Sequence, residues 1–237
     1  MYGFWAQNCL LWPCRAIDPG DPKLDATVRK MEVMGDLWGG GMHSEGRGSF
    51  WPYIGVDRAV GSILRGEPDR ALDYFCAFTD TAGGTLSWGE GYSGRIAGGD
   101  QPHMWADAQW INLFRQLFAF EDGATLWLTP ALFRRWHAGD RRVAVSGLPT
   151  HFGDLDLTAE PRTDGGRIRY RIRIEPRGDQ AERKLERMLL FPRISGGRAI
   201  RGVAVGGEAV RSFTRDAVVL PDPRRGQEIE VVIEAGA

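Results

Sequence analysis

Residues 100–118 have the sequence DQPHMWADAQWINLFRQLF, and this stretch decides how the rest of the chain is interpreted. It opens with Asp-Gln-Pro, which is a helix start signal, because Asp accepts hydrogen bonds from a first helical turn and Pro tolerates the missing N–H there. Apolar residues then recur so densely that the predicted helix is apolar on most sides. Such a helix is expected to be buried between neighbours.

Three more helices are expected before this one. Helical spacing of apolar residues and helix start signals indicate helices within residues 21–38, 49–66 and 67–78. The last two are joined by a very short connection, which predicts an antiparallel helical hairpin.

The hydrophobic period changes to two from Ala124 onward. The clearest example is RIRYRIRI at 167–174, which has one basic and one apolar face. Short alternating segments between glycine-rich and Asp-Pro turns predict an antiparallel β-sandwich. The fold class is therefore α+β, with a helical-hairpin domain at 1–121 and a sandwich domain at 122–237. A basic strand face would suit a polyanion, but a solvated face balanced by cross-strand acids is the favoured interpretation.

Composition argues against several functions. The 237 residues carry a formal net charge of −1, which gives no support for nucleic-acid binding by bulk electrostatics. No apolar run reaches the roughly 18–20 residues that span a bilayer, and the N-terminus is a poor signal peptide, so a cytoplasmic location and no membrane partner are expected. Cys9, Cys14 and Cys76 lack metal-ligand spacing and are interpreted as buried free thiols, and no cofactor is expected.

Two long glycine-rich segments interrupt the helical half. They read WGGGMHSEGRG at 38–48 and GGTLSWGEGYSGRIAGG at 83–99. Segments of this length and composition are costly to order unless they line a site. Since one hairpin separates them, both should emerge on the same side of a helical-hairpin array.

The side chains on these segments are typical of a sugar-binding cleft. Hydrolysis of a glycosidic bond needs a proton donor and a second carboxylate, and aromatic rings stack on the sugar. Glu90, flanked by glycines, is the strongest carboxylate candidate. Glu45 and Asp100 are further candidates, although Asp100 also suits a helix N-cap. The candidate substrate-binding residues are Trp38, His43, Arg47, Trp88, Tyr92 and His103, and for His103 a buried structural role is equally compatible with the sequence.

Residues 99–118, an apolar strand after them, and LPTHFGDL at 148–155 resemble the closing segment of the six-hairpin glycosidases. These enzymes have an (α/α)6 toroid and a trailing β-sandwich, and the resemblance is to α-L-rhamnosidase-like and glucoamylase-like members. In that family a loop with Trp and then Glu holds a catalytic carboxylate, and Ser87-Trp-Gly-Glu90 is similar to it. The resemblance implies a partial toroid, glycosidic-bond hydrolysis and a catalytic role for Glu90.

Twelve toroid helices with their loops need about 350 residues, and only four or five helices fit before residue 121. The chain is therefore expected to be a C-terminal part, unable to supply a whole site alone. A large open apolar face is rarely tolerated, so missing N-terminal helices, a second chain or self-association should cover it.

Two other functions stay open on the sequence. One is a non-catalytic carbohydrate-binding or structural module. The other is part of a polysaccharide lyase, in which Tyr92, Arg95 and His103 would suit proton abstraction beside an acidic sugar.

Overall fold

The protein is described by a computed structural model. It covers residues 6–7, 9–34, 37–38, 42–44, 49–93, 96–137, 141–161, 166–196, 198–221 and 225–236, with the backbone alone at 37–38, 42–44 and 137. The chain divides into two compact units, Met1–Gln116 and Leu117–Ala237. The change of hydrophobic period puts the boundary a few residues later, between residues 121 and 122.

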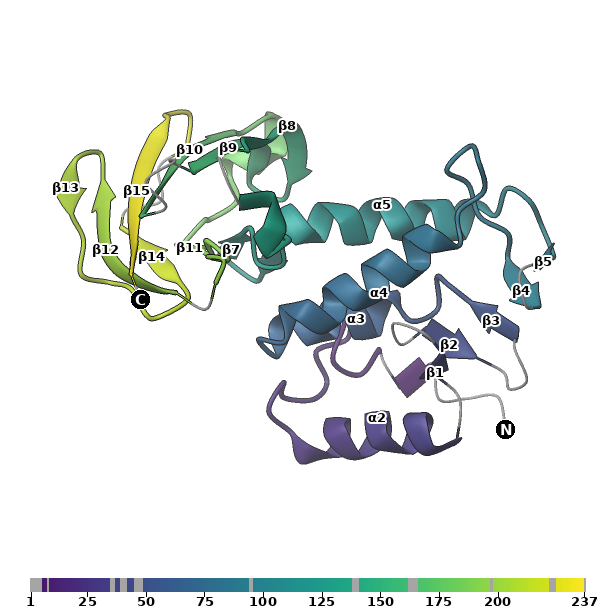
Figure 1. The fold of residues 1–237 in the computed structure, drawn as a ribbon. Helices are drawn as coiled ribbons and strands as arrows, with labels where there is room; N and C mark the ends of the chain where they lie inside the picture. Colours follow the sequence, from purple (N-terminus) through teal and green to yellow (C-terminus); the bar gives the residue numbers. More distant parts are fainter. Residues whose placement is uncertain are drawn as a thin grey trace. The chain divides into compact units, whose positions relative to one another are not determined.

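Within the described residues, four α-helices lie in the segments where apolar spacing predicts them (Figure 1). They are α2 (Pro22–Met34), α3 (Val56–Leu64), α4 (Pro68–Asp80) and α5 (Met104–Phe118). Gly66 turns the chain between α3 and α4 with a φ of +72°, a backbone conformation that favours glycine. The mixed α+β class is observed, whereas a toroid is not seen in this part of the chain.

The two glycine-rich segments are more regular than the sequence predicts, because they build a small antiparallel sheet (Figure 1). Its strands, in spatial order, are β1 (Leu37–Trp38), β2 (Met42–Ser44), β3 (Ser49–Trp51), β4 (Gly91–Ser93) and β5 (Ile96–Gly98). Pairing of β3 with β4 sets Phe50 opposite Tyr92. The two segments therefore belong to one sheet, in which β3 lies between β2 of the first segment and β4 of the second.

Tyr74 anchors the core of the first unit. It is fully buried on α4, and its hydroxyl donates a hydrogen bond to the carbonyl of Pro52. The ring packs against Gly55, where an added Cβ would lie 2.6 Å from Cε2 of the ring. A glycine is thus required just before α3 so that the helix can approach Tyr74.

Helix α5 is less buried than its composition predicts. Ala106 and Leu113 are fully buried on one side. The other side exposes Met104 at 79%, Trp105 at 51% and Ile111 at 62%. The expectation of a helix buried on most sides is wrong, and an apolar stripe is left at the surface.

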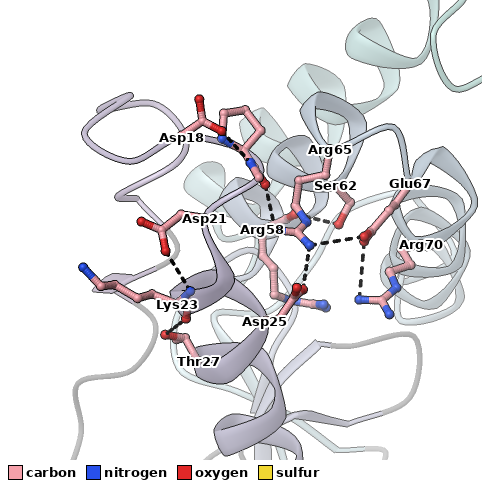
Figure 2. A network of polar contacts seen from close by, with 12 residues as sticks. Asp18, Asp21, Lys23, Asp25, Thr27, Arg58, Ser62, Arg65, Glu67 and Arg70 are labelled. Carbon is pink, nitrogen blue, oxygen red and sulfur yellow. Dashed lines mark hydrogen bonds and ion pairs between the residues drawn. The ribbon is translucent and has the colours of Figure 1, made fainter.

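Arg65, in the turn after α3, connects three parts of the first unit (Figure 2). Its Nη1 donates to the Pro19 carbonyl at 2.8 Å, and its Nη2 lies 2.6 Å from Asp25 of α2 and 3.4 Å from Glu67. The Arg65 side chain is only 16% exposed, so these contacts are partly shielded from water. This arginine clamp holds α2 and the preceding loop against the α3–α4 hairpin.

The second unit consists of two sheets around one shared core, the arrangement of a β-sandwich. One sheet has the order β13-β12-β15-β10-β9-β8 and the other β14-β11-β7-β6. The strands are β6 (Ala119–Asp122), β7 (Thr125–Leu128), β8 (Val143–Thr150), β9 (Gly153–Pro161), β10 (Arg167–Glu175), β11 (Arg187–Leu190), β12 (Ala199–Val205), β13 (Glu208–Ala209), β14 (Val218–Leu220) and β15 (Ile229–Gly236). Pairing is antiparallel except between β7 and β11, which run parallel. Inward residues of both sheets form the core, including Leu126, Tyr170 and Ile172.

The basic face of β10 is neutralised by acids, mostly from neighbouring strands. The ion pairs are Arg167–Glu234, Arg169–Glu230, Arg171–Glu160 and Arg173–Glu175. The inward residues Ile168, Tyr170, Ile172 and Ile174 alternate with these arginines and are buried. The interpretation of 167–173 as a balanced, solvated sheet face is confirmed.

The three cysteines are free, as expected, but they are not all buried. Cys14 is exposed, and Cys9 and Cys76 are half-buried. Cys9 Sγ donates to Asp57 at 3.2 Å, and burial followed by this contact raises the pKa of the Cys9 thiol to about 11. In the described part of the chain, no helix is both long and apolar enough to cross a membrane.

Candidate functional site

Glu90 is held in place by the backbone that surrounds it. It directly precedes β4, and β4 and β5 pair with Gly91 opposite Gly98. Beyond this hairpin, Glu90 N–H donates to the Asp100 carbonyl at 3.1 Å, and His103 N–H donates to the Trp88 carbonyl at 2.7 Å. The two chain segments therefore run together past the sheet, and they set Glu90 beside Asp100 and Trp88 beside His103.

The Glu90 side chain lies against Gly99. This glycine has a φ of +70°, and a Cβ added to it would collide with the carboxylate and the Cβ of Glu90. A side chain at residue 99 is thus excluded twice, by backbone conformation and by space. Glu90 remains half-buried, with its carboxylate at the edge of the small sheet.

Three rings gather near the chain segment that carries Glu90, since His103 is bonded through its backbone to Trp88. Tyr53 has its ring centroid 4.7 Å from that of His103 and 4.6 Å from that of Trp105, and the His103 and Trp105 centroids are 6.3 Å apart. Burial, and then the negative charge of Glu90, raise the pKa of the Tyr53 hydroxyl. Glu90 is therefore near enough to act on Tyr53, and Tyr53 stays a neutral hydroxyl at physiological pH.

Trp88 belongs to the core and not to an open surface. It is 2% exposed, its indole N–H donates to the Phe78 carbonyl at 2.9 Å, and its ring stacks on Trp110 with centroids 5.5 Å apart. Its backbone N–H also donates to Asp107 at 3.1 Å. In this structure the Trp88 ring has no exposed face for a sugar, contrary to the role expected from its loop position.

Tyr92 likewise has a structural task. Its hydroxyl donates to the Thr81 carbonyl at 2.8 Å and accepts the Gly89 N–H at 3.1 Å. The ring stacks on Phe50 with centroids 5.1 Å apart. These contacts fasten the loop that carries Glu90, and they engage the hydroxyl that a lyase would need as a base.

Asp100 does not start the helix as the sequence predicts, whereas His103 caps it, since its carbonyl accepts the Asp107 N–H at 3.1 Å. Helix α5 begins at Met104, and the acid of its first turn is Asp107. Asp100 is exposed, and its carbonyl accepts the Glu90 N–H. His103 is half-buried, and its Nδ1 accepts the Ala106 N–H at 3.4 Å.

The remaining candidates lie on the other glycine-rich segment. Trp38 ends β1, and His43 is in β2 opposite Trp51 of β3. Their strands, β1 and β2, belong to the same sheet as β4, the strand that follows Glu90. Glu45 and Arg47 lie outside the described residues, as does Arg95. Among the residues that the structure describes, no group of three or more His, Cys, Asp or Glu is placed to hold a metal ion.

Comparisons with known proteins return glycoside hydrolases, at low similarity. No family model matches the sequence, and no curated protein matches it. Among solved structures, one titled "Glycoside hydrolase" has a TM-score of 0.33, with 11% identity over 76% of this chain and 32% of its own. The GH127 β-arabinofuranosidase has a TM-score of 0.32, with 9% identity over 76% of this chain and 32% of its own. The chain spans about a third of the length of these proteins, and at these TM-scores the argument for function rests on the site itself.

Proposed function

We propose that the chain is part of a carbohydrate-active enzyme that hydrolyses glycosidic bonds, with Glu90 as its general acid or base. One observation carries this proposal: Glu90 is fixed by its backbone and by Gly99, on the segment whose Trp88 carbonyl binds the N–H of His103, a member of the ring group of Tyr53, His103 and Trp105. A carboxylate next to aromatic rings and a neutral hydroxyl supplies proton transfer, stacking and hydrogen bonding to one sugar ring.

Glu90 accounts for one wall of such a site. Hydrolysis requires a second carboxylate across the scissile bond. Asp100, whose carbonyl binds the Glu90 N–H, is one candidate for this role, and Glu45 is the other. As part of the same proposal, the part of the exposed stripe of α5 that contains Met104 and Ile111 is covered in the working enzyme by further helices, a second chain or a second copy, whereas Trp105 stays open to the site.

The test uses the full-length enzyme that supplies the rest of the site, and it measures release of p-nitrophenol from p-nitrophenyl α-L-rhamnopyranoside, α-L-arabinofuranoside and β-D-glucopyranoside. Glu90→Gln should lower the rate by about 10²-fold or more while the far-ultraviolet circular dichroism is unchanged. Asp73→Asn, an exposed acid on α4, is the matched control and should keep the full rate. Equal rates for wild type and Glu90→Gln would overturn the assignment. Saturable sugar binding without any product would instead favour the non-catalytic binding module.

A further inference from the structure

Trp105 is a large aromatic side chain that is half exposed and belongs to the ring group of Tyr53 and His103. Its exposed fraction is 51%, whereas Trp88, the tryptophan that the sequence favours for sugar stacking, is 2% exposed. An indole that stays at the surface forgoes much of the free energy that its burial would provide. This arrangement makes one ring face accessible to a ligand.

The indole is also held in position. It stands in the first turn of α5, two residues after His103, whose N–H is bonded to the Trp88 carbonyl at 2.7 Å. The ring lies against Tyr53 at a centroid distance of 4.6 Å and an interplanar angle of 47°. Because a tryptophan has only two side-chain torsions and this one is already packed on a buried neighbour, little conformational entropy remains to be lost on binding.

Trp105 is linked to the carboxylate through Tyr53. Tyr53 is 5% exposed and packs against Trp105, and burial followed by the negative charge of Glu90 raises the pKa of its hydroxyl. The backbone gives a second link, because His103 N–H donates at 2.7 Å to the carbonyl of Trp88, two residues before Glu90. A sugar ring lying on the indole would have its neighbouring glycosidic oxygen within the same small area of surface.

We infer that Trp105 is the stacking platform of this site and takes the C–H face of a pyranose ring beside Glu90, an inference that rests on the proposed function. The polar edge of the ring then faces the His103 imidazole and the Tyr53 hydroxyl. Trp105 acts by positioning the sugar and transfers no proton itself.

The same indole also belongs to the apolar stripe of α5, where Met104 and Ile111 are exposed at 79% and 62%. A protein partner covering that stripe would bury Trp105 together with Ile111. Two observations favour the sugar: Trp105 is the member of the stripe with aromatic partners, and it adjoins the carboxylate through Tyr53. Ile111, two turns further along α5, is therefore the matched control.

The experiment uses the 237-residue chain and three probes, methyl α-L-rhamnopyranoside, methyl β-D-galactopyranoside and methyl β-D-glucopyranoside. Saturation-transfer difference NMR gives the dissociation constant and shows which ring protons touch the protein. For the glycoside bound best, protons of one ring face should dominate. Trp105→Ala should weaken binding about tenfold or more, Trp105→Phe should restore part of it, and Ile111→Ser should leave it unchanged. Size-exclusion chromatography of the same variants reports self-association.

Equal affinities for wild type and Trp105→Ala would overturn the inference, and so would a lack of binding to all three probes. A loss of self-association in both Trp105→Ala and Ile111→Ser, without any change in sugar affinity, would assign the stripe to a protein interface. The proposed function can fail independently of this inference. If Trp105→Ala weakens sugar binding while Glu90→Gln leaves p-nitrophenol release unchanged, Trp105 is still the stacking platform and Glu90 is not the catalytic acid or base.

Discussion

At the scale of single residues, Glu90 depends on the glycine across from it. Gly99 has a φ of +70°, and its missing side chain leaves the space that the Glu90 carboxylate occupies. Gly98, its neighbour in β5, has no atom within 4 Å of an added Cβ. The structure therefore has room for a side chain at residue 98 but not at residue 99.

Gly99→Ala should destabilise the first unit by about 1–2 kcal/mol, because an L-residue is strained in the left-handed region, with displacement of Glu90 adding to that cost. Urea denaturation followed by tryptophan fluorescence measures the change in the free energy of unfolding. Gly98→Ala is the matched control and should stay within about 0.5 kcal/mol of wild type. Equal effects of the two substitutions would mean that Glu90 does not depend on Gly99.

The burial of Trp88 and Trp105 could not be predicted from the sequence around each residue. Trp88 lies in a glycine-rich loop and yet is buried, whereas Trp105 lies in a helical pattern and yet is half-exposed. Burial of an indole is decided by which segments pack around it, and that depends on contacts far away in the sequence. Tyr53 was missed for the same reason, since the helix start signal before α3 says nothing about what its ring will touch.

At the scale of elements, the arginine clamp holds α2 in place (Figure 2). Arg65→Ala removes a charge-assisted hydrogen bond to Asp25 and a bond to the Pro19 carbonyl, both at a site that is 16% exposed. The expected loss is about 1–3 kcal/mol, concentrated in α2 and the loop before it. Hydrogen exchange measured by mass spectrometry should show faster exchange in residues 18–34 and little change in the core of α4.

Arg70→Ala is the control for the clamp. The Arg70 side chain is 57% exposed and makes a 3.4 Å ion pair with Glu67, a geometry that contributes about 0–1 kcal/mol. Its removal should leave exchange in α2 unchanged. If both variants loosened α2 to the same degree, general surface charge and not the bonds of Arg65 would be responsible.

The Asp156 carboxylate accepts hydrogen bonds at a register shift between β8 and β9. The register shifts between Val145 and Leu148, and Asp156 of β9 accepts hydrogen bonds there from the Ser146 hydroxyl at 2.6 Å and the Gly147 N–H at 2.8 Å. These bonds, the Ser146 one first, lower the pKa of Asp156. A carboxyl with a lowered pKa in the folded state adds stability above its unfolded pKa, and this contribution is lost as pH falls through the folded value.

Asp156→Asn should therefore reduce the midpoint of denaturation of the second unit at pH 7, and the difference from wild type should shrink as the pH falls below about 4. Denaturation between pH 3 and pH 7 measures this. Ser146→Ala should reproduce part of the effect, and Asp216→Asn, at an exposed acid of the same unit, should show none of its pH dependence. A difference that persists undiminished at pH 3 would rule out ionisation of Asp156 as the cause.

The elements differ in how well the sequence predicts them. Apart from the two-residue β13, strands of the second unit have three to nine residues, and helices α2 to α5 have full helical spacing, so most of these elements can be predicted from local pattern. The small sheet cannot, because its strands have only two or three residues and lie among glycines. They form through pairing between segments far apart in the chain, such as Phe50 with Tyr92. For the same reason, the sequence does not predict the part of the site that depends on this sheet.

At the scale of the whole molecule, each of the two units has its own hydrophobic core. The core of the second unit is formed by strands β6 to β15 and the loops between them, and it includes Ile172 at 0% exposure. The first unit packs α3 and α4 around Tyr74, with Ile63 at 2% exposure. Helix α5 begins in the first unit and has its last two residues in the second, whereas the change of hydrophobic period after the helix puts a boundary between residues 121 and 122.

Two matched core truncations test whether the units are also separate in stability. Ile172→Ala and Ile63→Ala each remove the same atoms from a buried site, and each should cost about 2–5 kcal/mol in the unit that contains it. Because Ile63 is not a member of the core that contains Ile172, additivity of separate sites predicts that the other unit keeps its stability. Hydrogen exchange at increasing urea should show Ile172→Ala lowering protection in β9, β10 and β15 alone, and Ile63→Ala lowering it in α3 and α4 alone. Equal loss of protection throughout the chain in either variant would show that the two units unfold as one cooperative body.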